Sequence, residues 1–175
     1  VSVTDAQSQT TTYVYDAYGN MTTVTDAAGN VTTATYDQRG RKTSASDPDL
    51  GTWNYTYNTL DQVTTQTDAK SQTTTLGYDL LGRMVQRVEP RLTSDWIYDT
   101  AAHGIGRLAS ATTDSGYQRT HSYDALGRPS QVQFTINSVA HTYTTSYDAA
   151  GRVESVTYPS GFAVTNAYNA LGYQT

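Results

Sequence analysis

Tyr78-Asp79-Leu80-Leu81-Gly82-Arg83 decides the fold of this chain, because close copies of this stretch return about every twenty-one residues. A fixed period of that length is typical of repeat architectures, in which each unit contacts mainly its neighbours. The copies begin at Tyr15, Tyr36, Tyr57, Tyr78, Tyr98, Tyr123, Tyr147 and Tyr168. We therefore expect residues 1–175 to form a single array of about eight repeats, irregular at residues 89–120.

The aspartate and the glycine of each copy predict a tight turn. An aspartate at the first turn position accepts hydrogen bonds from backbone N–H groups ahead of it, and a glycine at the fourth adopts positive φ and closes a hairpin. The predicted turn residues are Asp16, Asp37, Asp79, Asp99, Asp124 and Asp148, with Gly19, Gly40, Gly82, Gly106, Gly127, Gly151 and Gly172. The copy at Tyr57 departs from the pattern, since Asp61 stands where glycine is expected.

A second series of turn signals lies about half a period away from the first. Asp26-Ala27-Ala28-Gly29-Asn30 is a clear member, and the segments between turns, such as Val31-Thr32-Thr33-Ala34-Thr35-Tyr36, are rich in β-branched and aromatic residues. Short segments of this kind between regularly spaced turns predict antiparallel strands. The expected fold class is all-β, a repeat array of antiparallel β-hairpins. We expect each repeat tyrosine to stack on the tyrosine of the next repeat.

Composition excludes several classes of partner. The formal net charge is −5, whereas nucleic-acid binders usually carry a basic patch, so we expect no nucleic-acid partner. The chain has no cysteine, which rules out disulfides and thiolate metal sites. No apolar run reaches the roughly 20 residues of a membrane helix, and no signal-peptide pattern opens the chain. We expect no membrane insertion by this segment, no metal and no cofactor.

No group of residues has the spacing of a catalytic site. Asp47 and Asp49 form a close carboxylate pair, but the turn around Pro48 accounts for them. The three histidines, His103, His121 and His141, lack the spacing of metal ligands. We therefore predict that the chain is not an enzyme.

The repeated Tyr-Asp-x-x-Gly-Arg unit, usually followed by an apolar residue, resembles the YD repeat of Rhs-type proteins. That family includes the C subunits of bacterial Tc toxin complexes and the teneurins. The segment from Trp96 to Leu108 is similar to a variant repeat of the bacterial members. The resemblance covers nearly the whole chain. It implies a spiralling, curved β-sheet that is a segment of a hollow YD-repeat shell.

The resemblance also implies a function. In bacterial members the shell encloses a C-terminal toxin, so the expected partners are the rest of the same shell and an enclosed toxin or effector domain. The implied location is secreted or at the cell surface, as part of a larger exported bacterial protein. The family's closing region, rich in Asp-Pro-x-Gly motifs, has no counterpart here, and no cleavage residues are assigned. We expect a fragment whose two exposed sheet edges favour self-association.

A second hypothesis is that the same repeats form an adhesion or carbohydrate-binding module. Exposed aromatic rings can stack on sugar rings, and the candidates are Trp53, Tyr55, Tyr57 and Trp96. The competing interpretation is that these rings pack within the sheet, and their register with the repeat favours it. A glycan is therefore the alternative partner.

Overall fold

The computed structural model describes all residues from Val1 to Thr175. Its elements are β-strands joined by turns, with no helix, and hence no helix that could span a membrane. The chain divides into two compact units, Val1–Arg91 and Leu92–Thr175, and each is described by itself. The division falls within residues 89–120, where the spacing of the repeats changes.

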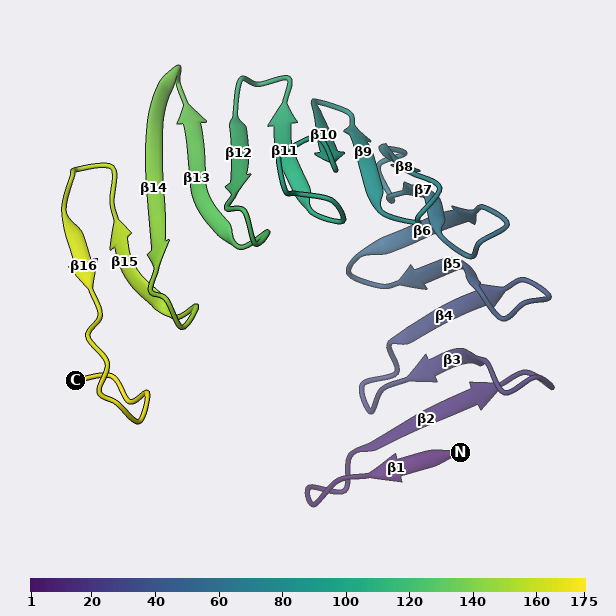
Figure 1. Cartoon of the computed structure of the whole chain (residues 1–175). Coiled ribbons are helices and arrows are strands. Elements are labelled where there is room, and N and C mark those ends of the chain that lie inside the picture. Colours follow the sequence, from purple (N-terminus) through teal and green to yellow (C-terminus); the bar gives the residue numbers. More distant parts are fainter. The chain divides into compact units, whose positions relative to one another are not determined.

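The first unit contains nine strands, each paired antiparallel with the next along the chain, as Figure 1 shows. They are β1 (Ser2–Thr4), β2 (Thr10–Tyr15), β3 (Met21–Thr25), β4 (Val31–Tyr36), β5 (Lys42–Asp47), β6 (Gly51–Tyr57), β7 (Val63–Thr67), β8 (Thr73–Tyr78) and β9 (Met84–Glu89). The order is that of successive hairpins, without crossover connections.

The second unit continues the same plan with seven strands. They are β10 (Leu92–Tyr98), β11 (Leu108–Thr113), β12 (Gln118–Tyr123), β13 (Pro129–Ile136), β14 (Val139–Tyr147), β15 (Val153–Thr157) and β16 (Ala163–Thr165). The predicted all-β array of antiparallel hairpins is confirmed.

Every repeat tyrosine except Tyr168 ends a strand at a β-bulge. In β2, for example, Val14 pairs with Thr23 while Tyr15 pairs with Met21, so the returning strand carries one extra residue. The same shift directly precedes Tyr36, Tyr57, Tyr78, Tyr98, Tyr123 and Tyr147. A glycine-associated bulge is the usual closure of this kind of hairpin.

The strands bury very little. Only Thr74, Gly104, Ala109 and Ala111 are buried, and no side chain is completely enclosed. A hairpin of this composition is at best marginally stable alone. Stability must therefore come mainly from pairs of side chains on adjacent strands and from contacts between successive turns.

Candidate functional site: the linked tyrosine turns

Each tyrosine turn is built around its aspartate. In the turn after β12, Asp124 Oδ1 accepts hydrogen bonds from the backbone N–H of Leu126 (3.0 Å) and of Arg128 (2.8 Å). The N–H of Gly127 donates to the Asp124 carbonyl at 2.8 Å, and Gly127 has φ of +74°. The same bonds recur in the turns that begin at Asp16, Asp37, Asp79 and Asp148. The turn chemistry expected from the sequence is therefore present.

Two turns use asparagine in place of this aspartate. Asn58 Oδ1 accepts from the N–H of Leu60 and Gln62, and Asn169 does the same in its own turn. At the glycine position of the first, Asp61 has φ of +64°. The loop therefore needs a side-chain oxygen at its first position and a residue that tolerates left-handed backbone at its fourth.

Three half-period turns of the first unit, those that begin at Asp5, Asp26 and Asp68, form the same five-residue loop. Asp26 Oδ1 accepts from the N–H of Ala28 and Asn30, and Asp5 and Asp68 make the equivalent bonds. Their preceding residues are threonines, where the tyrosine turns have tyrosine. The loop alone is thus common to both series, and the tyrosine marks those turns that are linked to a neighbouring repeat.

The fifth residue of the tyrosine turn is usually an arginine that joins two repeats. Arg128 Nε donates to Asp124 Oδ2 at 2.7 Å, which holds the guanidinium beside its own turn. Its guanidinium carbon lies 4.1 Å from the centre of the Tyr147 ring in the next repeat. The same placement is seen for Arg41 over Tyr57, Arg107 over Tyr123 and Arg152 over Tyr168.

The tyrosine hydroxyl makes the reverse connection. Tyr123 Oη donates to the carbonyl of Leu108 at 2.7 Å, and Leu108 is the residue that follows Arg107 in the previous repeat. Equivalent bonds of 2.7–2.9 Å join Tyr36 to Met21, Tyr57 to Lys42, Tyr78 to Val63, Tyr147 to Pro129 and Tyr168 to Val153. The acceptor is always backbone, which explains why lysine and proline are tolerated at this position.

The expected stacking of tyrosine on tyrosine is wrong for Tyr57, Tyr123, Tyr147 and Tyr168. Each of these rings has an arginine of the preceding repeat over its face. A guanidinium is planar and weakly hydrated, so it can lie against a ring while still bonding a carboxylate. The sequence carried a signal for this role, since most turns contain one arginine.

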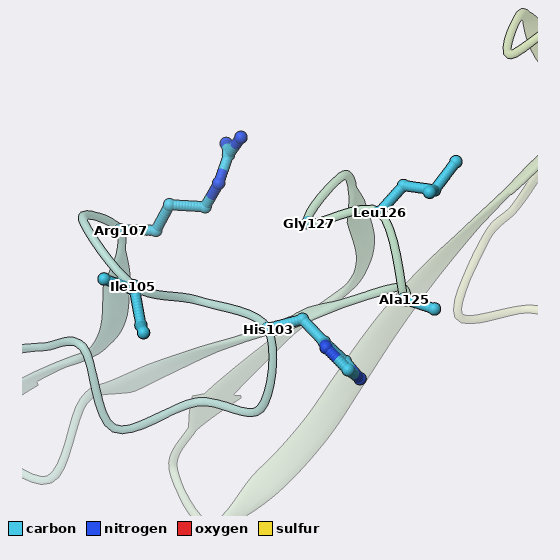
Figure 2. A pocket seen from close by; sticks show the side chains of 6 residues that line it. All are labelled: His103, Ile105, Arg107, Ala125, Leu126 and Gly127. Carbon is cyan, nitrogen blue, oxygen red and sulfur yellow. The ribbon is translucent and has the colours of Figure 1, made fainter.

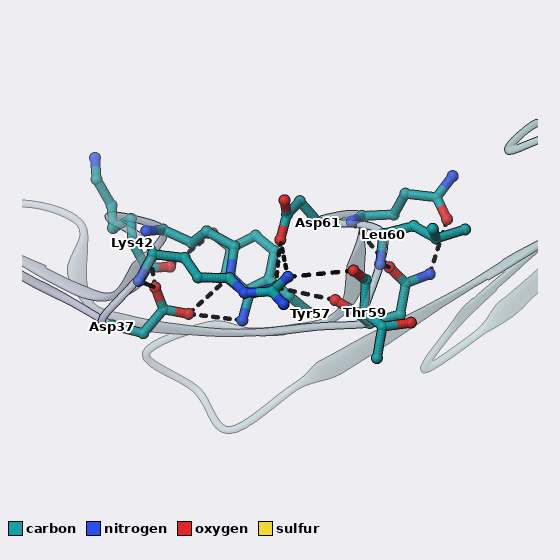
Figure 3. Close-up of polar contacts among 10 residues, drawn as sticks. Asp37, Lys42, Tyr57, Thr59, Leu60 and Asp61 are labelled. Carbon is teal, nitrogen blue, oxygen red and sulfur yellow. Dashed lines mark hydrogen bonds and ion pairs between the residues drawn. The ribbon is translucent and has the colours of Figure 1, made fainter.

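The most elaborate link surrounds Tyr57. Arg41 bonds Asp37 within its own turn and reaches Asp61 (2.8 Å) and the Asn58 carbonyl (2.9 Å) in the next. Figure 3 shows Asp37 and Asp61 on either side of the Tyr57 ring. Asp61 thus occupies the glycine position and also receives a cation from the previous repeat.

The turn carboxylates are held in their ionised form. For Asp148, hydrogen bonds from the backbone and then the side chain of Arg152 lower the pKa below its ordinary value. For Asp37, Asp79 and Asp124, partial burial acts to raise the pKa, but the hydrogen bonds from the following arginine outweigh it. Asp16, without an arginine, has its pKa lowered chiefly by the Asn20 amide. The charged aspartate is therefore part of the native turn.

The expanded copy at Tyr98 keeps the closing bonds over a longer loop. The N–H of Asp99 donates to the Arg107 carbonyl, and the N–H of Gly106 donates to Asp99 Oδ1 at 2.6 Å. A Cβ at Gly104 would lie 2.9 Å from the ring of Tyr123, so the loop packs closely on the next repeat. Figure 2 shows the shallow pocket of about 360 Å³ that results, lined by His103, Ile105, Arg107, Ala125, Leu126 and Gly127.

The four aromatic residues considered for sugar binding are divided between the two units. Trp53, Tyr55 and Tyr57 share a face of β6, and Trp96 lies on β10 in the second unit. Arg41 covers one face of Tyr57. Trp53 lines a pocket of about 190 Å³ together with polar side chains that include Gln66, Asp68 and Arg87. Sugar stacking by these residues stays a prediction.

The carboxylate of Asp47, considered above for catalysis, is bonded within a turn. Asp47 Oδ1 accepts from the N–H of Asp49 and Leu50, and its Oδ2 accepts from the Thr32 hydroxyl. These bonds lower the pKa of Asp47, the backbone bond from Asp49 most of all. Nowhere do three or more His, Asp or Glu side chains gather as a metal site would require.

The fold and the linked turns define a class of protein: an array of antiparallel hairpins in which each repeat is bonded to the one before it. The chain belongs to the teneurin YD-shell family, whose model matches residues 29–174. The model of the RHS repeat matches residues 1–31. The expected family is thereby confirmed. No curated protein sequence matches significantly.

Solved structures agree with this assignment at the level of fold. TcdB2-TccC3 without its hypervariable C-terminal region is similar with a TM-score of 0.77 and 16% identity, over 99% of this chain and 11% of that one. The Tc holotoxin pore of Photorhabdus luminescens is similar with a TM-score of 0.69 and 17% identity, over 92% of this chain and 10% of that one. The chain therefore spans about a tenth of the length of these structures.

Proposed function

We propose that the chain is a wall segment of a Rhs-type β-shell that encloses a C-terminal toxin or effector for delivery. Its role is structural rather than catalytic. The parent protein is bacterial and exported, and the partners of this segment are the remainder of the shell and the enclosed domain. The observation that carries the proposal is the recurring pair of opposite links between repeats, the arginine over the next tyrosine and the tyrosine hydroxyl on the previous carbonyl.

These links suit a wall because they recur along the array and need no closed core. An array built from them can be lengthened by adding repeats, each of which completes the bonds of its neighbour. The strands are rich in threonine, and no side chain is completely buried. The surface therefore suits a container that faces water on both sides.

Protease protection tests the proposal in the parent protein. The C-terminal domain should resist digestion while the shell is intact and should be degraded when it is produced alone. A C-terminal domain that is cleaved equally fast in both forms would contradict encapsulation, even if the hairpin array is folded as described.

A glycan-binding role is the second candidate, and one observation favours it. The pocket beside Trp53 combines an aromatic ring with donors and acceptors, including the paired side chains of Arg87 and Glu89. Trp53→Ala should abolish binding on a glycan array, while Tyr15→Ala, at an exposed ring on β2, should leave it unchanged. Absence of binding by the unmodified chain would remove this candidate.

A further inference from the structure

A pocket in the second unit has features that the wall does not require. It lies along β11, where Ala111 pairs with Trp96 of β10 on one side and with Arg119 of β12 on the other. Ala111 is only 9% exposed because it lies between these two large side chains. Ser94, Thr113 and Tyr117 complete most of the lining of a cavity of about 230 Å³. We call it the Arg119 pocket.

Arg119 differs from the arginines of the linked turns. Arg41, Arg83, Arg128 and Arg152 each form an ion pair with the aspartate of their own turn. No ion pair joins Arg119 to an acid, and its Nε is buried without a hydrogen-bond partner. A guanidinium is always charged, and a buried donor without a partner is destabilising. The Arg119 pocket therefore contains a cation that lacks an anion.

We propose that the Arg119 pocket binds a carboxylate carried on a small apolar group. The guanidinium of Arg119 has the planar arrangement of donors that suits a carboxylate. Trp96 and Tyr117 supply apolar surface for the attached group, and the hydroxyl groups of Ser94 and Thr113 add hydrogen-bonding partners. A single arginine in a pocket that is also lined by aromatic rings favours a monoanion over phosphate, which usually draws several cations or N–H groups.

The volume limits the size of the ligand. Pockets for drug-sized molecules usually measure roughly 300–1,000 Å³. At about 230 Å³ the Arg119 pocket accommodates a group the size of a large side chain. The ligand can be a free organic acid or an acidic side chain beside an apolar one in a polypeptide. This inference does not depend on the proposed encapsulation.

The test is a titration with 3-phenylpropionate, followed through the fluorescence of Trp96. The Trp53→Phe background leaves Trp96 as the only tryptophan, since the chain contains two. We expect a saturable change, and at least tenfold weaker binding of the neutral 3-phenylpropanamide, because the amide lacks the charge that pairs with Arg119. Equal binding of acid and amide would overturn the proposal, and this comparison needs no variant of the pocket.

Two variants test whether the ligand binds in the Arg119 pocket. Arg119→Gln should weaken binding at least tenfold, and Ala111→Leu should abolish it by filling the pocket. Arg87→Gln is the matched control, because Arg87 Nε is also buried without a partner, but Arg87 is already paired with Glu89 at 2.6 Å. The control should bind 3-phenylpropionate as tightly as the Trp53→Phe chain does. A loss in the control as large as in Arg119→Gln would overturn the proposal.

A last arm distinguishes the two sources of the carboxylate. N-acetyl-Asp-Phe-amide presents the acid within a peptide, and binding within tenfold of 3-phenylpropionate would identify a polypeptide as the ligand. Binding of the free acid alone would identify a small molecule. Acetate that binds as tightly as 3-phenylpropionate would overturn the proposal, because the apolar group would then contribute nothing.

Discussion

At the scale of single residues, two pairs of side chains have different roles in the repeat. The aspartate and the glycine form the loop, and the half-period turns show that this loop can form without tyrosine. The tyrosine and the arginine connect one repeat to another. Loss of the loop residues should therefore destabilise a hairpin, whereas loss of the linking residues should uncouple neighbours.

Replacing Tyr123 by phenylalanine should destabilise the chain by about 1 kcal/mol, because a partly buried hydrogen bond to the Leu108 carbonyl is lost while the ring remains. The free energy of unfolding in urea measures the effect. Tyr15→Phe is the control, since the Tyr15 ring is 47% exposed and no hydrogen bond of its hydroxyl is seen. Equal losses in the two variants would contradict the linking role of the hydroxyl.

Two glycines of one hairpin should respond in opposite ways to alanine. Gly82 has φ of +80°, so Gly82→Ala should cost about 1–2 kcal/mol from the left-handed backbone. Gly77 lies within β8, and a Cβ there meets only ordinary contacts, so Gly77→Ala should be neutral or stabilising by up to about 1 kcal/mol. Thermal unfolding of both variants tests this, and a harmless Gly82→Ala would show that the turn is not as described.

The loop was predictable from the sequence and the bonds of the tyrosine hydroxyls were not, for a physical reason. Asp124 and Gly127 act on neighbouring backbone, so their residue types reveal what they do. The acceptor of Tyr147 is the carbonyl of Pro129, eighteen residues earlier, and every residue type has a carbonyl. No sequence pattern marks such a partner, and stacking between tyrosines was expected in its place.

At the scale of elements, successive turns are joined by charge. In the turns that pair an aspartate with an arginine, the ionised carboxylate accepts the N–H groups and the arginine together, and its pKa is lowered accordingly. The strands between the turns were predictable from their β-branched residues and regular spacing. The bulge before the tyrosine follows from a turn that closes with a left-handed residue, and it could be anticipated only in general terms.

The lowered pKa values predict how stability depends on pH. A carboxyl group with a lowered native pKa binds fewer protons when folded, so it contributes stability at pH values above its unfolded pKa of about 3.8. That contribution should remain constant from pH 7 to about pH 5 and should be lost progressively as the pH falls through about 4 and below. The midpoint of thermal unfolding, measured from pH 7 to pH 2.5, checks the window.

The double variant Asp124→Asn and Asp148→Asn is the control for this dependence. Asparagine keeps the oxygen that accepts the N–H groups, as Asn58 does, but it does not titrate. The variant should unfold at a lower temperature at pH 7, and its unfolding midpoint should fall less on acidification. A variant with the same acid transition as the parent would contradict the assignment.

At the scale of the whole molecule, the chain consists of hairpin arrays with very little enclosed core, and the first and last strands each lack a neighbour on one side. Unpaired sheet edges recruit other strands. The 175-residue chain should therefore associate with itself at high concentration, as light scattering would detect. A monomer at all concentrations would contradict this expectation.

Lysine at the edges should suppress this association. Val3→Lys in β1 and Val164→Lys in β16 each add a charge to an edge strand at an exposed position. Val14→Lys in β2 is the control, because Val14 is 54% exposed but lies in an interior strand. Suppression by Val14→Lys equal to that of the edge variants would show that charge, rather than edge pairing, governs association.

The central claim is that these repeats form the wall of a container, and electron cryomicroscopy of the full-length parent protein tests it most directly. The account predicts a closed hollow shell, with residues 1–175 in its wall as successive hairpins and with density for an enclosed domain inside. An open rod, or an array whose repeats do not surround an enclosed space, would contradict it.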